Sequence, residues 1–184
     1  MATVLPGTTI ELSVLQKSSS RNLFDGIFAA GGISLSQVSV MTGLEPYIIQ
    51  NWVKRGFVSS PVKRQYTRDQ FARIVTINML KESLQLERIC KLLSVINGVL
   101  DDDSDDLISD SELYHHYVDL VALLENGTLD PQEMARGASE VAEDYKEPIP
   151  GARARLEKIL QIMAYAHYAS VLRKRADDML TSIL

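Results

Sequence analysis

The sequence predicts an all-α protein in which a winged helical head precedes a helical tail. Apolar residues recur at helical spacing through most of the chain, whereas the long Val, Ile and Thr alternations that mark strands are missing. Apolar residues make up 46% and charged residues 23%, as in an ordinary globular protein. We expect a head over residues 1–100, an acidic linker over 101–110 and a helical domain over 111–184.

The first part of the head is expected to contain little regular structure. Residues 1–20 are predicted to be irregular or at most extended, with the serines at 18–20 in a loop. The next segment, 22–32, has the pattern of a short apolar helix stopped by a Gly pair. This helix would cover the core of the elements that follow it.

Two short helices are predicted after the helix over 22–32. Ser34 and Gln37 have the spacing of a capping box, which starts a helix that ends at Gly43. Pro46 begins the second helix, where its missing N–H costs nothing, and Gly56 ends that helix. Short helices joined by a tight glycine-containing turn are typical of a helix-turn-helix.

The second of these helices has one apolar and one polar face. Ile48, Ile49, Trp52 and Val53 share the face that would pack on the first helix. The residues predicted to point outward are Tyr47, Gln50, Asn51, Lys54 and Arg55.

A short wing is predicted between this helix and a third one. Pro61 sets an extended path, so that Lys63, Arg64 and Gln65 would lie on a strand or loop ending at Tyr66. Two further helices are expected, one beginning at a capping box of Thr67 and Gln70, the other spanning 86–99.

The tail begins after a run in which six of the ten residues 101–110 are Asp. A calcium loop would need a Gly and a final Glu at offsets where this run has neither, so a solvated linker is predicted. Helices are expected over 112–125 with Ser111 as the cap, over 131–145, and over 152–184. The segment 156–172 is apolar on nearly every face and should be buried, either by the preceding helices or by a second subunit.

Charge is divided unevenly along the chain. Residues 45–91 hold nine Lys or Arg against four acidic residues, a net charge of +5, although the whole chain carries −5. A basic segment in an acidic protein can bind a polyanion. Lys54, Arg55, Lys63, Arg64, Arg68 and Arg73 could neutralise phosphates, and the amides of Gln50 and Asn51 could read adenine.

Enzyme chemistry is not indicated. The sequence has no Gly-rich phosphate loop, nucleophile elbow or zinc spacing, and the adjacent His115 and His116 would point in different directions on a helix. We therefore expect no catalytic residue, no metal and no cofactor. The single Cys90, with no secretory signal and no membrane-spanning segment, predicts a cytoplasmic protein without a membrane partner.

The order of these elements resembles the MerR-type winged helix-turn-helix. The residues that carry the resemblance are Leu35, Val38, Thr42, Gly43, Ile49, Trp52, Gly56, Phe57, Val58, Pro61, Arg64 and Tyr66. It covers residues 34–99 of the chain. Over most of its length the chain also looks like a bacterial family of unknown function, through the strings NLFDGIFAAGG and QNWVKRG, the acidic linker and the helical tail.

The MerR-type resemblance implies a symmetric dimer that binds double-stranded DNA with the second helix in the major groove. It also implies that Arg64 and Tyr66 touch phosphate from the wing. The chain departs from the pattern in having Gln50 where the family has Arg, and a wing about four residues shorter. The family's long dimer helix directly after the fourth helix is replaced here by the linker and tail.

The predicted function is a DNA-binding transcriptional regulator that acts as a homodimer. A protein-interaction adaptor and a small-molecule sensor with the same fold are the alternatives. The tail would serve either as a dimerisation bundle or as the enclosure of an unknown small-molecule effector near Tyr165, His167 and Tyr168.

Overall fold

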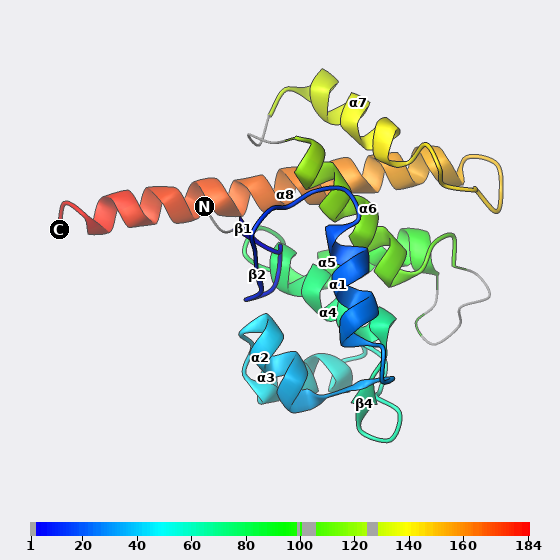
Figure 1. Ribbon diagram of the computed structural model, residues 1–184. Coiled ribbons are helices and arrows are strands. Elements are labelled where there is room, and N and C mark those ends of the chain that lie inside the picture. The colour runs from blue at the N-terminus through cyan, green and yellow to red at the C-terminus, as the bar shows by residue number, and fades with distance from the viewer. Residues whose placement is uncertain (1–2, 99, 101–105, 125–128) are drawn as a thin grey trace.

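The computed structural model describes residues 3–98, 100, 106–124 and 129–184, and this part is mostly helical, as predicted (Figure 1). Its helices are α1 (Ser19–Ile27), α2 (Leu35–Thr42), α3 (Pro46–Lys54), α4 (Arg68–Leu80), α5 (Leu86–Asn97), α6 (Asp110–Leu123), α7 (Pro131–Val141) and α8 (Ala152–Thr181). Its strands form two antiparallel pairs, β1 (Thr3–Val4) with β2 (Glu11–Leu12) and β3 (Ile33–Ser34) with β4 (Gln65–Tyr66). Across these residues, no helix combines the length and the apolarity that a membrane crossing requires.

Helix α4 lies at the centre of the molecule (Figure 1). Every residue from Gln70 to Ile77 is buried, and α2, α5, α6 and α8 all contact this helix. A helix surrounded by other elements on several sides must bury most of its circumference.

Helix α6 is the second buried helix and joins the two parts of the chain. Its residues 111 and 113–120 are buried, and it packs against α1, α4, α7 and α8. One cluster of buried apolar side chains extends from Leu5 to Ala166. The division into head and tail stays a prediction, and residues 101–105 of the predicted linker lie outside the described residues.

The N-terminal segment is more ordered than its composition indicates. Strands β1 and β2 form a hairpin, and Leu5 at its bend is fully buried. Gly7 O accepts a hydrogen bond from the amide of Asn78 at 2.9 Å, and Pro6 O accepts one from the hydroxyl of Tyr114 at 2.8 Å. Partners on α4 and α6 thus order this hairpin, and no local pattern reveals them.

Helix α1 begins earlier than predicted. Ser19 and Ser20 are helical rather than part of a loop, because the carboxylate of Asp119 accepts a hydrogen bond from the backbone N–H of Ser18 at 2.7 Å. Ser18 has a φ of 67°, which turns the chain into the helix.

The cap predictions are confirmed for two helices and corrected for a third. Capping boxes form at Ser34 with Gln37 and at Thr67 with Gln70, where α2 and α4 begin. Helix α6 is capped by Ser109, which accepts from the N–H of Glu112, and not by Ser111.

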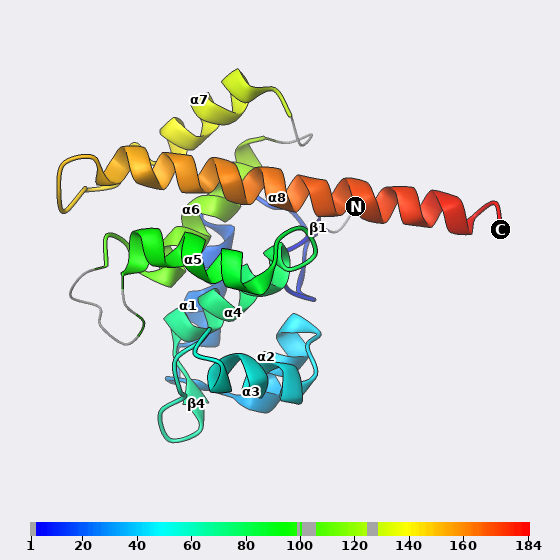
Figure 2. The same ribbon diagram turned by 180° about the vertical axis from the view of Figure 1, so that it is seen from behind.

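The last two helices also differ from the prediction. Helix α7 ends at Val141 rather than at residue 145, and the hydroxyl of Tyr145 instead donates to Leu107 O at 2.6 Å. Burial along α8 ends near Ala166, whereas Leu172 is 51% exposed. The distal half of α8 projects from the body in both views (Figures 1 and 2).

Candidate functional site

Helices α2 and α3 pack together, and α3 presents a polar face to the outside. Ile49 and Trp52 are buried on the inner face of α3. The glycine that ends α2, Gly43, has a φ of 69° and lets the chain turn directly into α3. Among the predicted contact residues, the side chains that α3 exposes are Tyr47, Gln50, Asn51 and Lys54.

The segment between Val62 and Gln65 is a tight hairpin turn. The N–H of Gln65 donates to Val62 O at 2.9 Å, and the two residues between them, Lys63 and Arg64, have φ angles of 51° and 63°. Two consecutive left-handed residues are the signature of a type I′ turn, which usually carries Asn and Gly. Here the two corner positions carry exposed cations instead.

This turn and α3 border one shallow hollow. The hollow has a volume of about 380 Å³ and is lined by Leu35, Gln50, Val53, Pro61, Arg64 and Tyr66. Gln50 and Arg64 are the polar residues of its lining. Tyr66 is only 3% exposed, and burial raises the pKa of its hydroxyl. The predicted phosphate contact of Tyr66 stays a prediction.

The predicted cations divide into unpaired and paired groups. Among the described residues, no ion pair holds Lys54, Lys63 or Arg64. Arg55 lies 2.5 Å from the carboxylate of Glu87 and sits over the ring of Phe57. Arg68 is also a paired cation, with the carboxylate of Asp25 as its partner.

Arg73 does not lie on the surface, which corrects its inclusion among the phosphate contacts. It is 6% exposed, its Nε donates to Phe57 O at 2.7 Å, and its Nη1 lies 3.2 Å from the carboxylate of Asp110. A guanidinium held on both sides in this way stabilises the junction between α3, α4 and α6.

A buried polar network around His115 connects α1, α4 and α6. Its Nε2 lies 3.2 Å from a guanidinium nitrogen of Arg68, which can only donate, so Nδ1 carries the proton and donates to the Ser20 hydroxyl at 2.8 Å. Arg68 also lies 2.6 Å from the carboxylate of Asp25. Burial, followed by the charge of Arg21, lowers the pKa of His115 from 6.5 to about 4.

The neighbouring His116 points elsewhere, as predicted. Its Nδ1 lies 2.8 Å from Val141 O, so His116 contacts α7, whereas His115 contacts α1 and α4. Nδ1 of His167 on α8 is hydrogen-bonded to the hydroxyl of Tyr117, and the imidazole stacks on the ring of Tyr168. In the described part of the chain, no three His, Cys, Asp or Glu side chains are grouped so that they could hold a metal ion.

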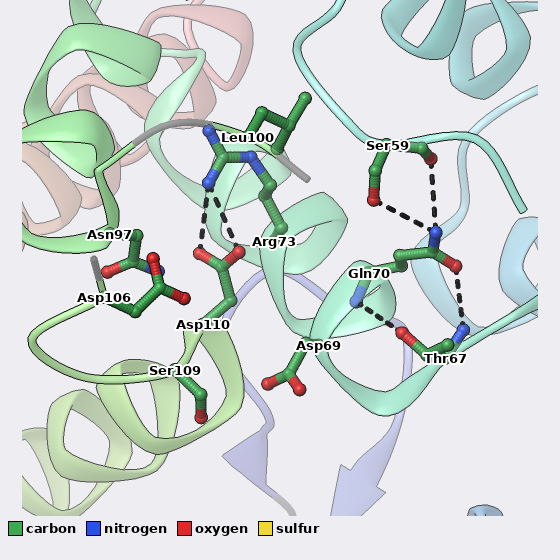
Figure 3. A pocket seen from close by; sticks show the side chains of 10 residues that line it. All are labelled: Ser59, Thr67, Asp69, Gln70, Arg73, Asn97, Leu100, Asp106, Ser109 and Asp110. Atoms are coloured by element: carbon green, nitrogen blue, oxygen red, sulfur yellow. Dashed lines mark hydrogen bonds and ion pairs between the residues drawn. The ribbon is translucent and has the colours of Figure 1, made fainter. Parts of the chain in front are cut away.

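A second, more polar pocket lies where α4, α5 and α6 meet (Figure 3). It has a volume of about 600 Å³ and is lined by Ser59, Thr67, Asp69, Gln70, Arg73, Asn97, Leu100, Asp106, Ser109 and Asp110. The amide of Gln70 donates to the Ser59 hydroxyl at 3.0 Å, and Asp69 accepts from the N–H of Ser111 at 2.9 Å. The sequence patterns missed this pocket because its residues come from four separate segments.

The match to known families covers the middle of the chain. Residues 33–117 are similar to a family whose model is described as a domain of unknown function (DUF1836). That span runs from β3 into α6 and includes both the hollow and the polar pocket. Comparisons with curated proteins and with solved structures found no match. The match fits the expected likeness to a family without an assigned function, and it names no activity.

Proposed function

We propose that this protein is a DNA-binding transcriptional regulator whose α2, α3 and β3–β4 hairpin form a MerR-like winged helix-turn-helix. In this proposal α3 enters the major groove, and the turn at Lys63 and Arg64 follows the adjacent backbone as a short wing. The observation that carries it is the shared hollow of Gln50 and Arg64, which brings an amide that can read a base next to an unpaired cation.

The distribution of unpaired charge supports the same surface. Lys54, Lys63 and Arg64 are exposed and have no ion-pair partner in the described part of the chain, whereas Arg55 and Arg68 are engaged with acidic residues. Phosphate contacts require cations that are free to exchange their counterions for phosphate. The first three cations should therefore contribute more to affinity than Arg55 or Arg68.

The test is pull-down of genomic fragments followed by binding measurements on an enriched fragment. Lys54→Glu with Arg64→Glu should weaken binding more than tenfold and flatten the dependence of log affinity on log salt by roughly 0.9 per lost contact. Arg55→Glu is a poorer probe, because it would place a second carboxylate beside Glu87. Lys158→Glu, an exposed change on α8, is the matched control and should bind like the wild type.

A protein-interaction adaptor is the second candidate. The hollow is bordered by Leu35, Val53 and Pro61, and the ring of Tyr47 on the same helix is 68% exposed. An aromatic beside an apolar hollow suits a peptide anchor. If the wild type enriches no DNA above background, the regulator proposal fails and the adaptor is preferred.

The proposed regulator acts as a homodimer, and α8 offers the contact surface. Past the body, Leu172, Ala176 and Met179 share one face of α8, and Leu172 and Met179 are at least half exposed. Lys174 and Arg175 precede Asp177 and Asp178 in this segment. Antiparallel pairing with a second copy, centred on Ala176, would set each basic side chain against an acidic one.

A further inference from the structure

Asn97 is a buried amide whose hydrogen-bonding groups have no partner among the described residues. The residue is 5% exposed, and within that part of the chain neither Nδ2 nor Oδ1 forms a hydrogen bond. It is the last residue of α5 and lines the polar pocket. Buried polar groups in folded proteins are nearly always paired, so an unpaired amide that faces a cavity points to a ligand that completes it.

The charge of the pocket indicates which ligand would fit. Three carboxylates line it, those of Asp69, Asp106 and Asp110, against the single guanidinium of Arg73. Figure 3 shows Asn97, Asp106 and Asp110 toward one side of the pocket and Gln70 with Ser59 toward the other. The starts of α4 and α6, which would favour an anion, are already capped by Thr67 and Ser109 and carry Asp69 and Asp110 in their first turns.

We infer that the polar pocket is a binding site for a small cationic molecule that also carries a carboxamide-like edge. The edge would pair with the donor and acceptor of Asn97, and the cationic group would lie in the negative field of the three carboxylates. The volume of about 600 Å³ is that of an ordinary small-molecule site.

The position of the pocket connects it to the proposed DNA surface. Arg73 joins Asp110 on the pocket wall to Phe57 O at the end of α3, and Gln70 holds Ser59 and Ser60 on the path to the turn. A ligand between Asn97 and Asp110 would therefore lie next to the Arg73–Asp110 ion pair, and Arg73 connects that pair to Phe57 at the start of the 57–66 segment. This regulatory role rests on the proposed function, whereas binding in the pocket does not.

Binding can be measured by titrating ¹⁵N-labelled protein with 4-guanidinobutanamide, which has both a cation and a carboxamide. The side-chain amide signals of Asn97, identified by their loss in Asn97→Leu, should shift and saturate. Glutaramate, which replaces the cation by a carboxylate, and the neutral pentanamide should bind at least tenfold more weakly. Equal responses to all three compounds would overturn the ligand class, and no saturable response to any of them would overturn the site.

Two asparagine variants separate a ligand role from a structural one. Asn78 donates to Gly7 O and Thr42 O, so Asn78→Leu should lower the melting temperature by several degrees. Asn97→Leu removes no hydrogen bond within the described residues, and it should leave the melting temperature equal or higher while it weakens probe binding at least tenfold. A melting loss in Asn97→Leu as large as that in Asn78→Leu would show that the amide is structural.

DNA affinity measured with and without the probe tests the regulatory role separately. Saturable probe binding that leaves the affinity for an enriched DNA fragment unchanged would contradict the regulatory role but support the binding site. If the protein binds the probe but enriches no DNA, the proposed function is contradicted and the binding site is still supported.

Discussion

The imidazole of His115 is neutral in the folded protein and uses both ring nitrogens. It accepts from Arg68 on α4 and donates to Ser20 on α1, and it is itself fully buried on α6. Protonation would place an imidazolium against the guanidinium of Arg68. The packing of α1, α4 and α6 against one another thus depends on His115 remaining neutral.

This arrangement predicts how stability changes with pH. Unfolded His115 binds a proton below 6.5, whereas the folded protein resists protonation until about 4, so the free energy of unfolding falls as the pH drops through that window. Between pH 7 and pH 5 the wild type should lose about 2 kcal/mol more than His115→Gln in urea denaturation. Parallel pH profiles for the two proteins would contradict the assignment, since His116 and His167, whose pKa values burial also lowers, remain in both.

The exposure or burial of a single residue was predictable where it depends only on residues nearby in the sequence. Helical periodicity alone places Gln50 and Lys54 outside and Trp52 inside, and the structure confirms each placement. The burial of Arg73 was not predictable in this way, because its partner Asp110 lies 37 residues away. Asn97 at the end of a helix likewise gave no local sign of its unpaired amide.

At the scale of elements, the β1–β2 hairpin depends on one glycine. Gly7 has a φ of +75°, and a Cβ built there would lie 2.3 Å from Val75 O. Gly7→Ala should lower the free energy of unfolding by roughly 2 kcal/mol, through strain and loss of hairpin docking. Gly26→Ala on α1, where a Cβ meets nothing within 4 Å, is the control and should stabilise by roughly 0.5 kcal/mol.

The projecting part of α8 makes a prediction about assembly. Leu172→Glu with Met179→Glu places two charges on the exposed apolar stripe and should convert a dimer to a monomer in analytical ultracentrifugation, with the melting temperature of the body unchanged. Arg173→Glu is less suitable, since Arg173 lies 2.5 Å from the carboxylate of Glu82 on the body. A wild type that sediments as a monomer at high concentration would remove the dimer from the proposal.

Elements were predicted well where caps mark them. The starts of α2 and α4 follow from Ser34 and Thr67, whose side chains accept the expected backbone hydrogen bonds. The N-terminal hairpin and the start of α1 were missed, because the groups that order them lie on α4 and α6. Within one chain, α8 is buried only as far as Ala166. Burial of the remainder of 156–172 by a second subunit stays a prediction.

For the whole molecule, the shared core predicts cooperative unfolding. Helices α4 and α6 pack together, and buried apolar side chains connect Leu5 to Ala166 without a break. Calorimetry should therefore show a single transition, with equal calorimetric and van't Hoff enthalpies. Two separated transitions would instead support independent head and tail domains.

The docking of the β1–β2 hairpin also has a consequence for synthesis on the ribosome. Asn78 on α4 and Tyr114 on α6 donate hydrogen bonds to the bend of this hairpin, and the bond from Tyr114 to Pro6 spans 108 positions. At about 10 residues per second, β1 and β2 wait roughly ten seconds after their own synthesis for these partners to be translated. The docking of the hairpin is thus a late step of folding, although its strands precede α4 and α6 in the chain.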